Sequence, residues 1–183
     1  MPRREEMESG SGRSPLTAPL ARESRGHDAS RSVVTARAAG TDDLPGIKVL
    51  VDSHRHELGF VPRPALQQAI ERGWLYVAES AEVLVGMIDW WARRDGVVVL
   101  YNVVVAPAAR GRGAGGLLLD TMIHWARARN AVAIQLKCPL DLPANEFYRH
   151  HRFTLTDQEP GKRRPLNCWY LPLTVAGERG SHA

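Results

Sequence analysis

The residues from Arg110 to Gly116 have the composition of an anion-binding turn. This segment, RGRGAGG, follows a β-branched run typical of a buried strand and precedes apolar residues at helical spacing. Backbone N–H groups at a helix start have no intrahelical acceptor, and the helix dipole adds partial positive charge there. Glycines let a bulky diphosphate approach that backbone, and Arg110 and Arg112 add charge at the rim. The segment therefore predicts a phosphate-binding site.

Two common phosphate-binding motifs do not fit this spacing. A P-loop requires a Lys-Ser or Lys-Thr pair after its last glycine, whereas 114–116 here read Ala-Gly-Gly. A dinucleotide fingerprint needs an acidic residue roughly 20 positions further on, after a second strand. The next predicted strand instead carries Gln135, Leu136 and Lys137. Neither a P-loop nor a dinucleotide site is therefore expected.

The segment resembles the signature of the GNAT N-acetyltransferase superfamily, V-x-P-x-x-R-G-x-G-x-G/A. Here the signature is contiguous over 105–115, VAPAARGRGAG, and lies between the expected strand and helix. The alternative, a glycine-rich helix start without a ligand, would not call for this density of glycine and arginine. The resemblance covers roughly residues 32–173. It implies acetyl-CoA as the cosubstrate and direct transfer of its acetyl group to a primary amine in a ternary complex.

The resemblance also implies where acetyl-CoA is held. The diphosphate would contact the amides of a run of seven residues: Arg110, Gly111, Arg112, Gly113, Ala114, Gly115 and Gly116. The pantetheine arm would pair with the central strand at Val103, Val104 and Val105. A backbone amide at that strand edge would polarise the thioester carbonyl.

A second motif of the family, roughly N-x-x-A-x-x-F-Y-x-x-x-G-F, resembles residues 141–153, DLPANEFYRHHRF. It implies that Tyr148 is the acid that reprotonates the leaving thiolate, since a phenol with a pKa near 10 matches that task. The alternative is an aromatic ring packed under the cofactor. Asp141 replaces the usual asparagine, so Asn145 is the candidate for a side-chain contact to the cofactor. Arg152 replaces a glycine, which indicates a different turn or a basic group near the adenine.

The acceptor site is less defined. Asn102 in the central strand cannot accept a proton, whereas Asp89, Glu57 and His56 are candidate bases. Glu57, Asp89 and Asn102 are expected to contact the acceptor substrate, and the two carboxylates would suit a cationic amine. Each candidate base has a solvated or structural role as its alternative. An amine that is already neutral would need little from any side chain.

Other reactive residue types carry weaker signals. The histidine clusters 54–56 and 150–151 have no cysteine or carboxylate at ligand spacing, so no metal site is expected. Cys138 has no histidine near it in sequence, which favours a buried thiol over a nucleophile. Trp90 and Trp91 would place one indole on each sheet face. One is expected in the core, and the other at the acceptor site or a homodimer contact.

Composition bounds the remaining function classes. The 183 residues, 44% hydrophobic and 24% charged, are typical of one globular domain. The net charge of +4 is explained by a CoA-type ligand, so nucleic acid is not the expected partner. No apolar run approaches the ~18–20 residues of a membrane span. Two cysteines and no secretion signal predict a cytoplasmic protein with reduced thiols.

The elements that must position these residues follow from periodicity and from turn signals. Segments 1–31 and 174–183 are predicted to be disordered tails around a domain at 32–173. Strands are predicted at 32–38, 74–79, 83–93, 97–105, 132–138, 153–155 and 166–173. Helices are predicted at 44–58, 65–72 and 144–151, and a further helix follows the glycine-rich turn from Leu117 to about Arg129.

The order of these elements resembles the GNAT fold. This α/β (α+β) architecture implies a mixed, mostly antiparallel twisted sheet that is splayed at its central strand, with helices on both faces. Two function classes compete with the enzyme. One is a non-catalytic acyl-CoA-binding regulatory module, and the other is a nucleic-acid-binding domain that uses the basic surface.

Overall fold

Seven strands and five α-helices make up the part of the chain that this computed structural model describes, residues 33–173. The first half comprises β1 Val34–Ala38, the 3-10 turn η1 Thr41–Asp43, α1 Leu44–Ser53, α2 Arg55–Leu58, α3 Arg63–Glu71, β2 Leu75–Ser80 and β3 Val83–Ala92. The second half comprises β4 Val97–Val105, the 3-10 turn η2 Pro107–Ala109, α4 Ala114–Arg127, β5 Ala133–Pro139, α5 Ala144–His150, β6 Thr154–Glu159 and β7 Leu166–Pro172. The predicted tails, 1–31 and 174–183, lie outside the described residues.

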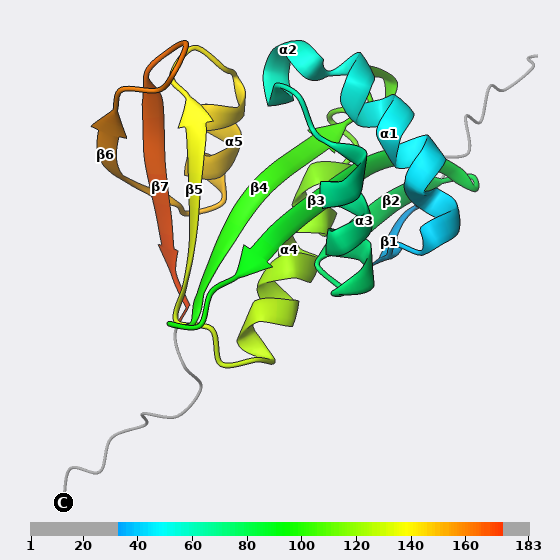
Figure 1. Cartoon of the computed structure of the whole chain (residues 1–183), viewed down its shortest axis with the longest axis horizontal. Helices are drawn as coiled ribbons and strands as arrows, with labels where there is room; N and C mark the ends of the chain where they lie inside the picture. The colour runs from blue at the N-terminus through cyan, green and yellow to red at the C-terminus, as the bar shows by residue number, and fades with distance from the viewer. Residues whose placement is uncertain (1–32, 174–183) are drawn as a thin grey trace, which may run out of the picture. The chain divides into compact units, whose positions relative to one another are not determined.

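The strands form one sheet in the order β1-β2-β3-β4-β5-β7-β6. Every neighbouring pair is antiparallel except β4 and β5, which run parallel. That parallel pairing extends only from Val97↔Ala133 to Val99↔Gln135, after which the two strands diverge (Figure 1). The prediction of a mixed sheet splayed at its central strand is therefore confirmed.

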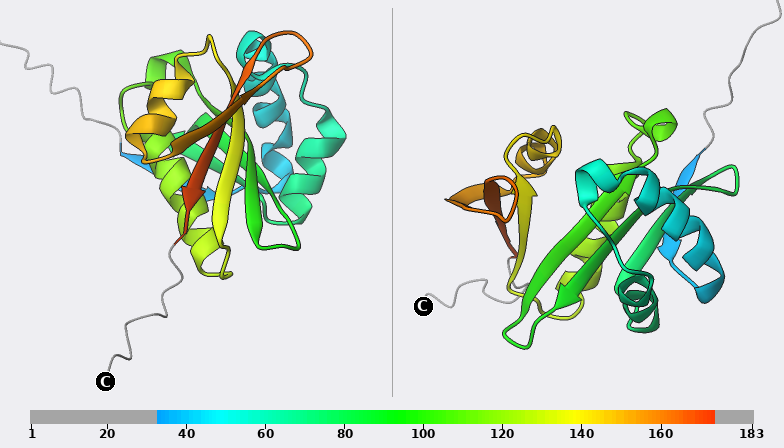
Figure 2. Two further views of the ribbon diagram at one scale, coloured as in Figure 1. Left: turned by 90° about the vertical axis from the view of Figure 1, so that its left-hand side faces the viewer. Right: turned by 45° about the horizontal axis from the view of Figure 1, so that its top comes forward.

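Helices cover both faces of the sheet, as predicted (Figure 2). On one face α4 lies across β1 to β4, and Leu118, Leu119 and Met122 are fully buried there. On the other face α1 and α3 cover β2 and β3, with Ile47 and Leu66 fully buried. Each helix buries the apolar stripe that its sequence period predicts. The sheet consequently separates two hydrophobic cores, one on each side.

The predicted helix at 44–58 is interrupted at His54, which separates α1 from α2. His54 has a non-helical backbone, with φ −111° and ψ 24°. Its ring Nδ1 lies 2.9 Å from the carbonyl oxygen of Leu50, and the Ser53 hydroxyl donates to the same oxygen at 2.8 Å. These side-chain groups compete for a carbonyl near the helix end, which favours a break there. The apolar period runs through this break, so it did not reveal it.

The strand predicted at 153–155 is also longer in the structure, where β6 extends to Glu159. It is an edge strand whose residues are mostly exposed, so it has no alternating apolar pattern by which it could be recognised. Its pairing with β7 places the β6–β7 loop beside the splay (Figure 2).

Candidate active site

The turn between β4 and α4 leaves a run of backbone amides without acceptors. Gly111 and Gly113 have φ of 73° and 86°, a left-handed backbone that glycine adopts without strain. Gly113 caps α4, whose first turn has neither a capping side chain nor an acidic residue. Within residues 33–173, none of the N–H groups of residues 111–116 donates a hydrogen bond. Six consecutive amides are thus free to bind an anion.

The four glycines of this turn have two different environments. A Cβ on Gly111 or Gly113 would meet no atom within 4 Å, so the space above these residues is open. A Cβ on Gly115 would lie 3.3 Å from the Phe147 ring, and one on Gly116 would lie 3.3 Å from the His151 ring. The second pair therefore allows the start of α4 to approach α5 and its C-terminal end. Sequence reasoning assigned all four to the cofactor and missed this packing.

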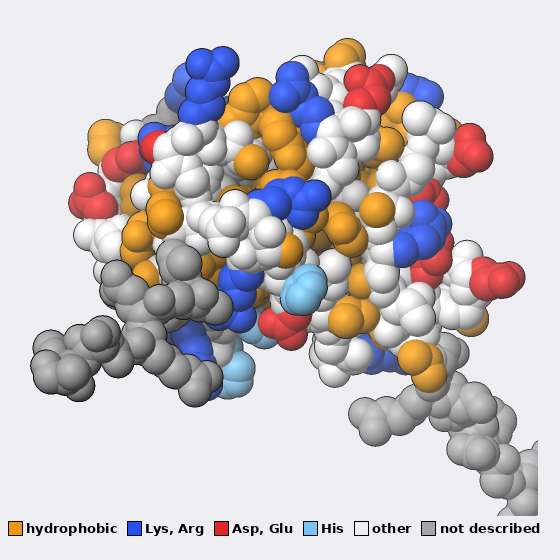
Figure 3. Space-filling view, turned by 90° about the horizontal axis from the view of Figure 1, so that it is seen from below, with side chains coloured by type: hydrophobic (Ala, Val, Ile, Leu, Met, Phe, Trp, Pro, Cys, Tyr) orange, Lys and Arg blue, Asp and Glu red, His pale blue; other side chains and the backbone are white. Residues whose placement is uncertain are grey.

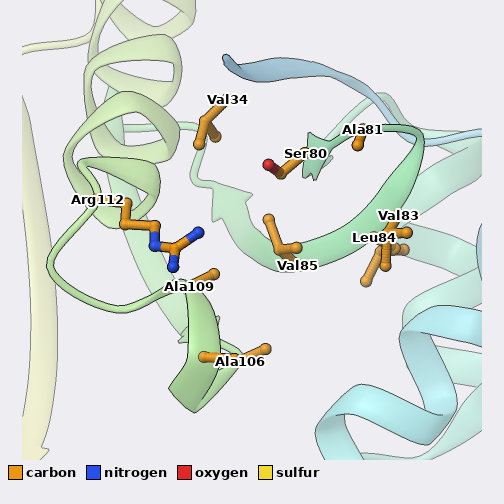
Figure 4. A pocket seen from close by; sticks show the side chains of 10 residues that line it. Val34, Ser80, Ala81, Val83, Leu84, Val85, Ala106, Ala109 and Arg112 are labelled. Atoms are coloured by element: carbon orange, nitrogen blue, oxygen red, sulfur yellow. The ribbon is translucent and has the colours of Figure 1, made fainter. Parts of the chain in front are cut away.

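The two arginines of the turn point in different directions. Arg110 Nε donates to the Val105 carbonyl at 3.0 Å, and its Nη2 lies 3.1 Å from both carboxylate oxygens of Glu57. Arg112 instead lines a 300 Å³ hollow between η2, β1 and the β2–β3 turn, where it faces Val34 and Ala109 (Figure 4). The turn therefore has one arginine directed toward α2 and one toward β1.

Beside the splay, the pairing of β3 with β4 is interrupted by a bulge. The register shifts after Asp89, which pairs with Asn102, so that Tyr101 has no partner. Met87 and Val104, two residues away, belong to the core under α1 and α3, and side chains alternate along a strand. Asp89 and Asn102 consequently face the same side as those two helices. The structure thus brings together two of the three residues predicted to contact the acceptor.

The Asp89 carboxyl is buried, and its hydrogen-bond partner is an amide. The Asn102 side chain donates to Asp89 Oδ1 at 2.8 Å. Burial raises the pKa of Asp89 to about 7, and hydrogen bonds from Asn102 only partly oppose this rise. Near neutral pH the carboxyl is therefore present in both its protonated and its ionised form. A pKa matched to the working pH is typical of a general base.

Tyr148 of α5 is buried among aromatic rings on the opposite arm of the splay. Its ring lies 5.5 Å from Phe147, 5.8 Å from Phe153 and 6.4 Å from Trp169, measured between centroids. Burial, with a smaller contribution from Cys138, raises the pKa of the Tyr148 phenol above its ordinary value. The hydroxyl therefore stays protonated at neutral pH, and the raised pKa makes it a weaker acid than an ordinary phenol. Burial likewise raises the pKa of the Cys138 thiol to about 11, which favours the buried-thiol interpretation.

Asn145 has its side-chain amide committed to the protein. Its Nδ2 lies within hydrogen-bond distance of the carbonyl oxygens of Pro139, Leu140 and Leu142. Its Oδ1 accepts from Asn167 at 2.9 Å and from the Trp169 indole at 3.0 Å. The side chain is 7% exposed. No polar atom is left for a cofactor, so Asn145 joins α5 to β7 and is not part of the site proposed below.

The third predicted acceptor residue, Glu57, lies on α2, which bridges the splay. Its carboxylate meets Arg110 from the β4 side, as described above. From the β5 side, Arg164 of the β6–β7 loop donates to the carbonyls of His56 and Glu57 at 3.3 and 3.4 Å. Arg164 also pairs with Asp141 at 3.0 and 3.1 Å. Its basic neighbourhood, Lys-Arg-Arg, has the composition of a solvated turn and gave no sign of this bridge.

The described residues contain no clustered metal ligands, and one face of the molecule carries both basic and acidic side chains. Residues 33–173 contain no group of three His, Cys, Asp or Glu side chains placed to hold a metal ion. When the molecule of Figure 1 is seen from below, basic and acidic side chains both appear on the exposed face (Figure 3). That face offers no continuous positive surface of the kind that duplex nucleic acid requires. No helix of the described part is long and apolar enough to cross a membrane.

Comparison with known proteins gives one family and many structures. The sequence profile of the Acetyltransferase (GNAT) family matches residues 48–153. No curated protein gives a significant match to the sequence. Among solved structures, Ard1 from Thermoplasma volcanium is similar with a TM-score of 0.71 at 17% identity, over 77% of this chain and 98% of that chain.

Two further similar structures have names that state an activity. The ribosomal-protein-S18-alanine N-acetyltransferase from Escherichia coli has a TM-score of 0.67 at 18% identity, over 82% of this chain and all of its own. The N-acetylglutamate synthase from Neisseria gonorrhoeae, solved with coenzyme A and N-acetyl-glutamate, has a TM-score of 0.68 at 19% identity. That match covers 78% of this chain and 36% of the synthase chain. At such identities these similarities establish the fold.

Proposed function

This chain belongs to the acetyltransferase (GNAT) family, and from that premise we propose that it transfers an acetyl group from acetyl-CoA to a primary amine. The transfer is direct, within a ternary complex. Bound acetyl-CoA supplies the thioester whose carbonyl carbon the amine attacks. The single observation that carries the proposal is the run of six unpartnered amides, residues 111–116, beside the splay of the sheet.

Backbone and side-chain groups of the chain can bind the separate parts of acetyl-CoA. The free amides and the open space above Gly111 and Gly113 fit a diphosphate. Among the strands of residues 33–173, none pairs with β4 at Val103–Val105 on the β5 side, so this edge can bind an extended amide-rich arm. Arg110 lies between these two places, at the end of β4.

Among the candidate bases, the geometry favours Asp89. It is buried beside the bulge of β4 and holds a proton with a pKa of about 7. Glu57 is held by Arg110, and His56 is an exposed side chain on α2. We assign Asp89 the removal of the proton from the acceptor ammonium, and we assign Asn102 the orientation of the Asp89 carboxylate. Tyr148 then donates its phenolic proton to the departing thiolate.

The direct test combines thiol release with substitution of Tyr148. Purified protein is given acetyl-CoA and a panel of primary amines, and free thiol is measured over time. We expect Tyr148→Phe to lower kcat by about a hundredfold or more while the dissociation constant for CoA stays unchanged. The matched control is Tyr76→Phe on β2, a tyrosine that stacks on Trp90 outside the proposed site; it should retain turnover.

Two outcomes would contradict the proposal. If the protein binds acetyl-CoA but releases no thiol with any amine, a non-catalytic acyl-CoA-binding module is the better account. If Tyr148→Phe retains full turnover while Tyr76→Phe behaves as expected, the acid is another group.

A further inference from the structure

A pocket of 460 Å³ lies between α2 and the β6–β7 loop. Its lining residues are Arg55, Gly59, Phe60 and Arg163. The Arg55 guanidinium lies 4.9 Å from the centroid of the Phe60 ring, which is 66% exposed. A flat apolar ring beside two guanidinium groups is a surface that binds an anion attached to an apolar stem.

The acidic residues around this pocket are already neutralised by other cations. Glu57 pairs with Arg110, and Asp141 pairs with Arg164. Within residues 33–173, neither Arg55 nor Arg163 forms an ion pair. The pocket therefore has two positive charges that no carboxylate of the described chain balances.

The pocket is tied to the proposed active site by a chain of contacts. Arg164, next to Arg163, donates to the carbonyl oxygens of His56 and Glu57. The Glu57 carboxylate meets Arg110, and Arg110 Nε donates to the carbonyl at the end of β4. Arg55 and Arg163 therefore lie on α2 and the β6–β7 loop, the two segments that this chain of contacts joins to the end of β4.

From this arrangement we infer that the acceptor carries one or more carboxylates near its amine, and that Arg55 and Arg163 bind them. The inference rests on the proposed function and specifies its acceptor. Guanidinium groups bind carboxylates through paired, charge-assisted hydrogen bonds, and unbalanced positive charge also speeds the encounter with an anion. The acidic residues that suggest a cationic amine in the sequence do not oppose this. Glu57 is compensated by Arg110, and Asp89 is partly protonated near neutral pH.

A free amino acid and an acidic peptide N-terminus both carry a carboxylate near the amine. The test therefore includes both kinds of acceptor and compares them. Three tetrapeptides with an N-terminal alanine differ only at their second and third residues, which are both glutamate, both glutamine or both lysine. Free glutamate and glutamine form the second arm. We expect the acidic peptide to exceed the glutamine peptide in kcat/KM by about tenfold and the lysine peptide to be poorest. Preference for glutamate among the free amino acids alone would identify the smaller acceptor.

Charge reversal in the pocket supplies the residue-level test. Arg55→Glu and Arg163→Glu should each reduce kcat/KM for the acidic acceptor by about tenfold, mainly through KM. The double variant should prefer the lysine peptide. The matched control is Arg94→Glu, an exposed arginine in the β3–β4 turn at the far end of the sheet, which should keep the original preference. Thermal unfolding of all the variants confirms that each is folded.

A binding measurement keeps this inference separate from the proposed function. The same tetrapeptides are titrated calorimetrically into protein saturated with CoA. Tighter binding of the acidic peptide, lost in Arg163→Glu and retained in Arg94→Glu, supports the inference even where no thiol is released. Equal binding and equal turnover of the acidic, neutral and basic peptides would overturn it while leaving the acetyltransferase proposal intact.

Discussion

The turn proposed to bind the cofactor and the pocket proposed to bind the acceptor are built in opposite ways. The turn is a contiguous stretch, residues 110–116, and it presents main-chain amides. The pocket presents side chains from α2 and from the β6–β7 loop, segments joined by a hydrogen bond between residues 108 positions apart. A site made of main-chain amides tolerates many different side chains, provided that the backbone can still form the turn. Side-chain recognition changes with each substitution.

This contrast indicates that the proposed acceptor site can change with side-chain substitutions more readily than the proposed diphosphate site. The proposed diphosphate site depends on the left-handed backbone at Gly111 and Gly113 and on the start of α4. The proposed acceptor site depends on the charged side chains of α2 and of the β6–β7 loop. Substitutions in the turn should therefore alter cofactor affinity alone, and substitutions in the pocket should alter acceptor choice alone.

The largest effect should come from Asp89, the proposed general base. Asp89→Asn should lower kcat by about a hundredfold or more, because the amide cannot accept a proton. In the unmodified protein, kcat should rise with pH through about 7 as the carboxyl ionises, and this limb should disappear in the variant. Asn102→Ala serves as the comparison, since it removes only the hydrogen bond. A pH limb that persists in Asp89→Asn would assign the base elsewhere.

The same carboxyl should leave a signature in stability. Its pKa is raised in the folded state, so the fold binds the proton more tightly than the unfolded chain does. The resulting stabilisation is complete below about pH 4, where an unfolded aspartate also binds its proton, and is lost as the pH rises through the folded value. Urea unfolding between these limits should show the free energy of unfolding decline relative to Asp89→Asn. Parallel curves for the two proteins would contradict this.

A large effect on the cofactor alone should follow from Gly113→Val. A β-branched residue at φ 86° is strained, and it would distort the amides that precede α4. We expect CoA affinity to fall by about tenfold to a hundredfold, while the relative preference among acceptors is unchanged. The matched control is Gly73→Val, at φ 66° and also with open space around it, at the end of α3. If both variants weaken CoA binding equally, the loss comes from general destabilisation.

A purely structural effect should follow from Asn145→Ala. This removes the partners of Asn167 and of the Trp169 indole, so the free energy of unfolding should fall by about 2–4 kcal/mol. Calorimetric titration should find CoA affinity unchanged at a temperature where the variant remains folded. Loss of CoA affinity without loss of stability would return Asn145 to the cofactor site.

The smallest effect should come from the contact that joins the two regions. Glu57→Gln removes the charge that pairs with Arg110 on the exposed side of α2. We expect CoA affinity to rise by about twofold to fivefold, since Arg110 is released toward the diphosphate and exposed ion pairs are weak. The matched control is Glu71→Gln at the end of α3, which should leave CoA affinity unchanged. A fall in CoA affinity on Glu57→Gln would mean that the pair positions Arg110 for the cofactor.

The same contrast explains how much the sequence could predict. The turn at 110–116, the order of the strands and helices and the splay at β4 were all accessible, because they follow from local patterns or from resemblance to the family. The break at His54 could not be predicted from the sequence. The His54 ring nitrogen and the Ser53 hydroxyl compete for the Leu50 carbonyl without changing the apolar period. The exposed end of β6 had no apolar alternation to reveal it.

For the proposed site, backbone roles could be assigned from a contiguous sequence motif, whereas side-chain roles depend on contacts that only the fold creates. The side-chain oxygen of Asn145 accepts hydrogen bonds from Asn167 and Trp169, which lie near it only in the folded sheet. The roles of Arg163 and Arg164 depend on α2, more than a hundred residues earlier in the chain. Likewise, the raised pKa of Asp89 follows from burial, which a single sequence does not state.

The central claim, that bare amides of the glycine turn bind the diphosphate, is tested most directly by NMR. Backbone amide signals of ¹⁵N-labelled protein are followed during titration with CoA and, separately, with pantetheine, which lacks the diphosphate. We predict that the amides of Gly111, Gly113, Gly115 and Gly116 shift strongly with CoA and little with pantetheine, whereas those of Val103–Val105 shift with both. Saturation by CoA that leaves the four glycine amides unmoved would contradict the account.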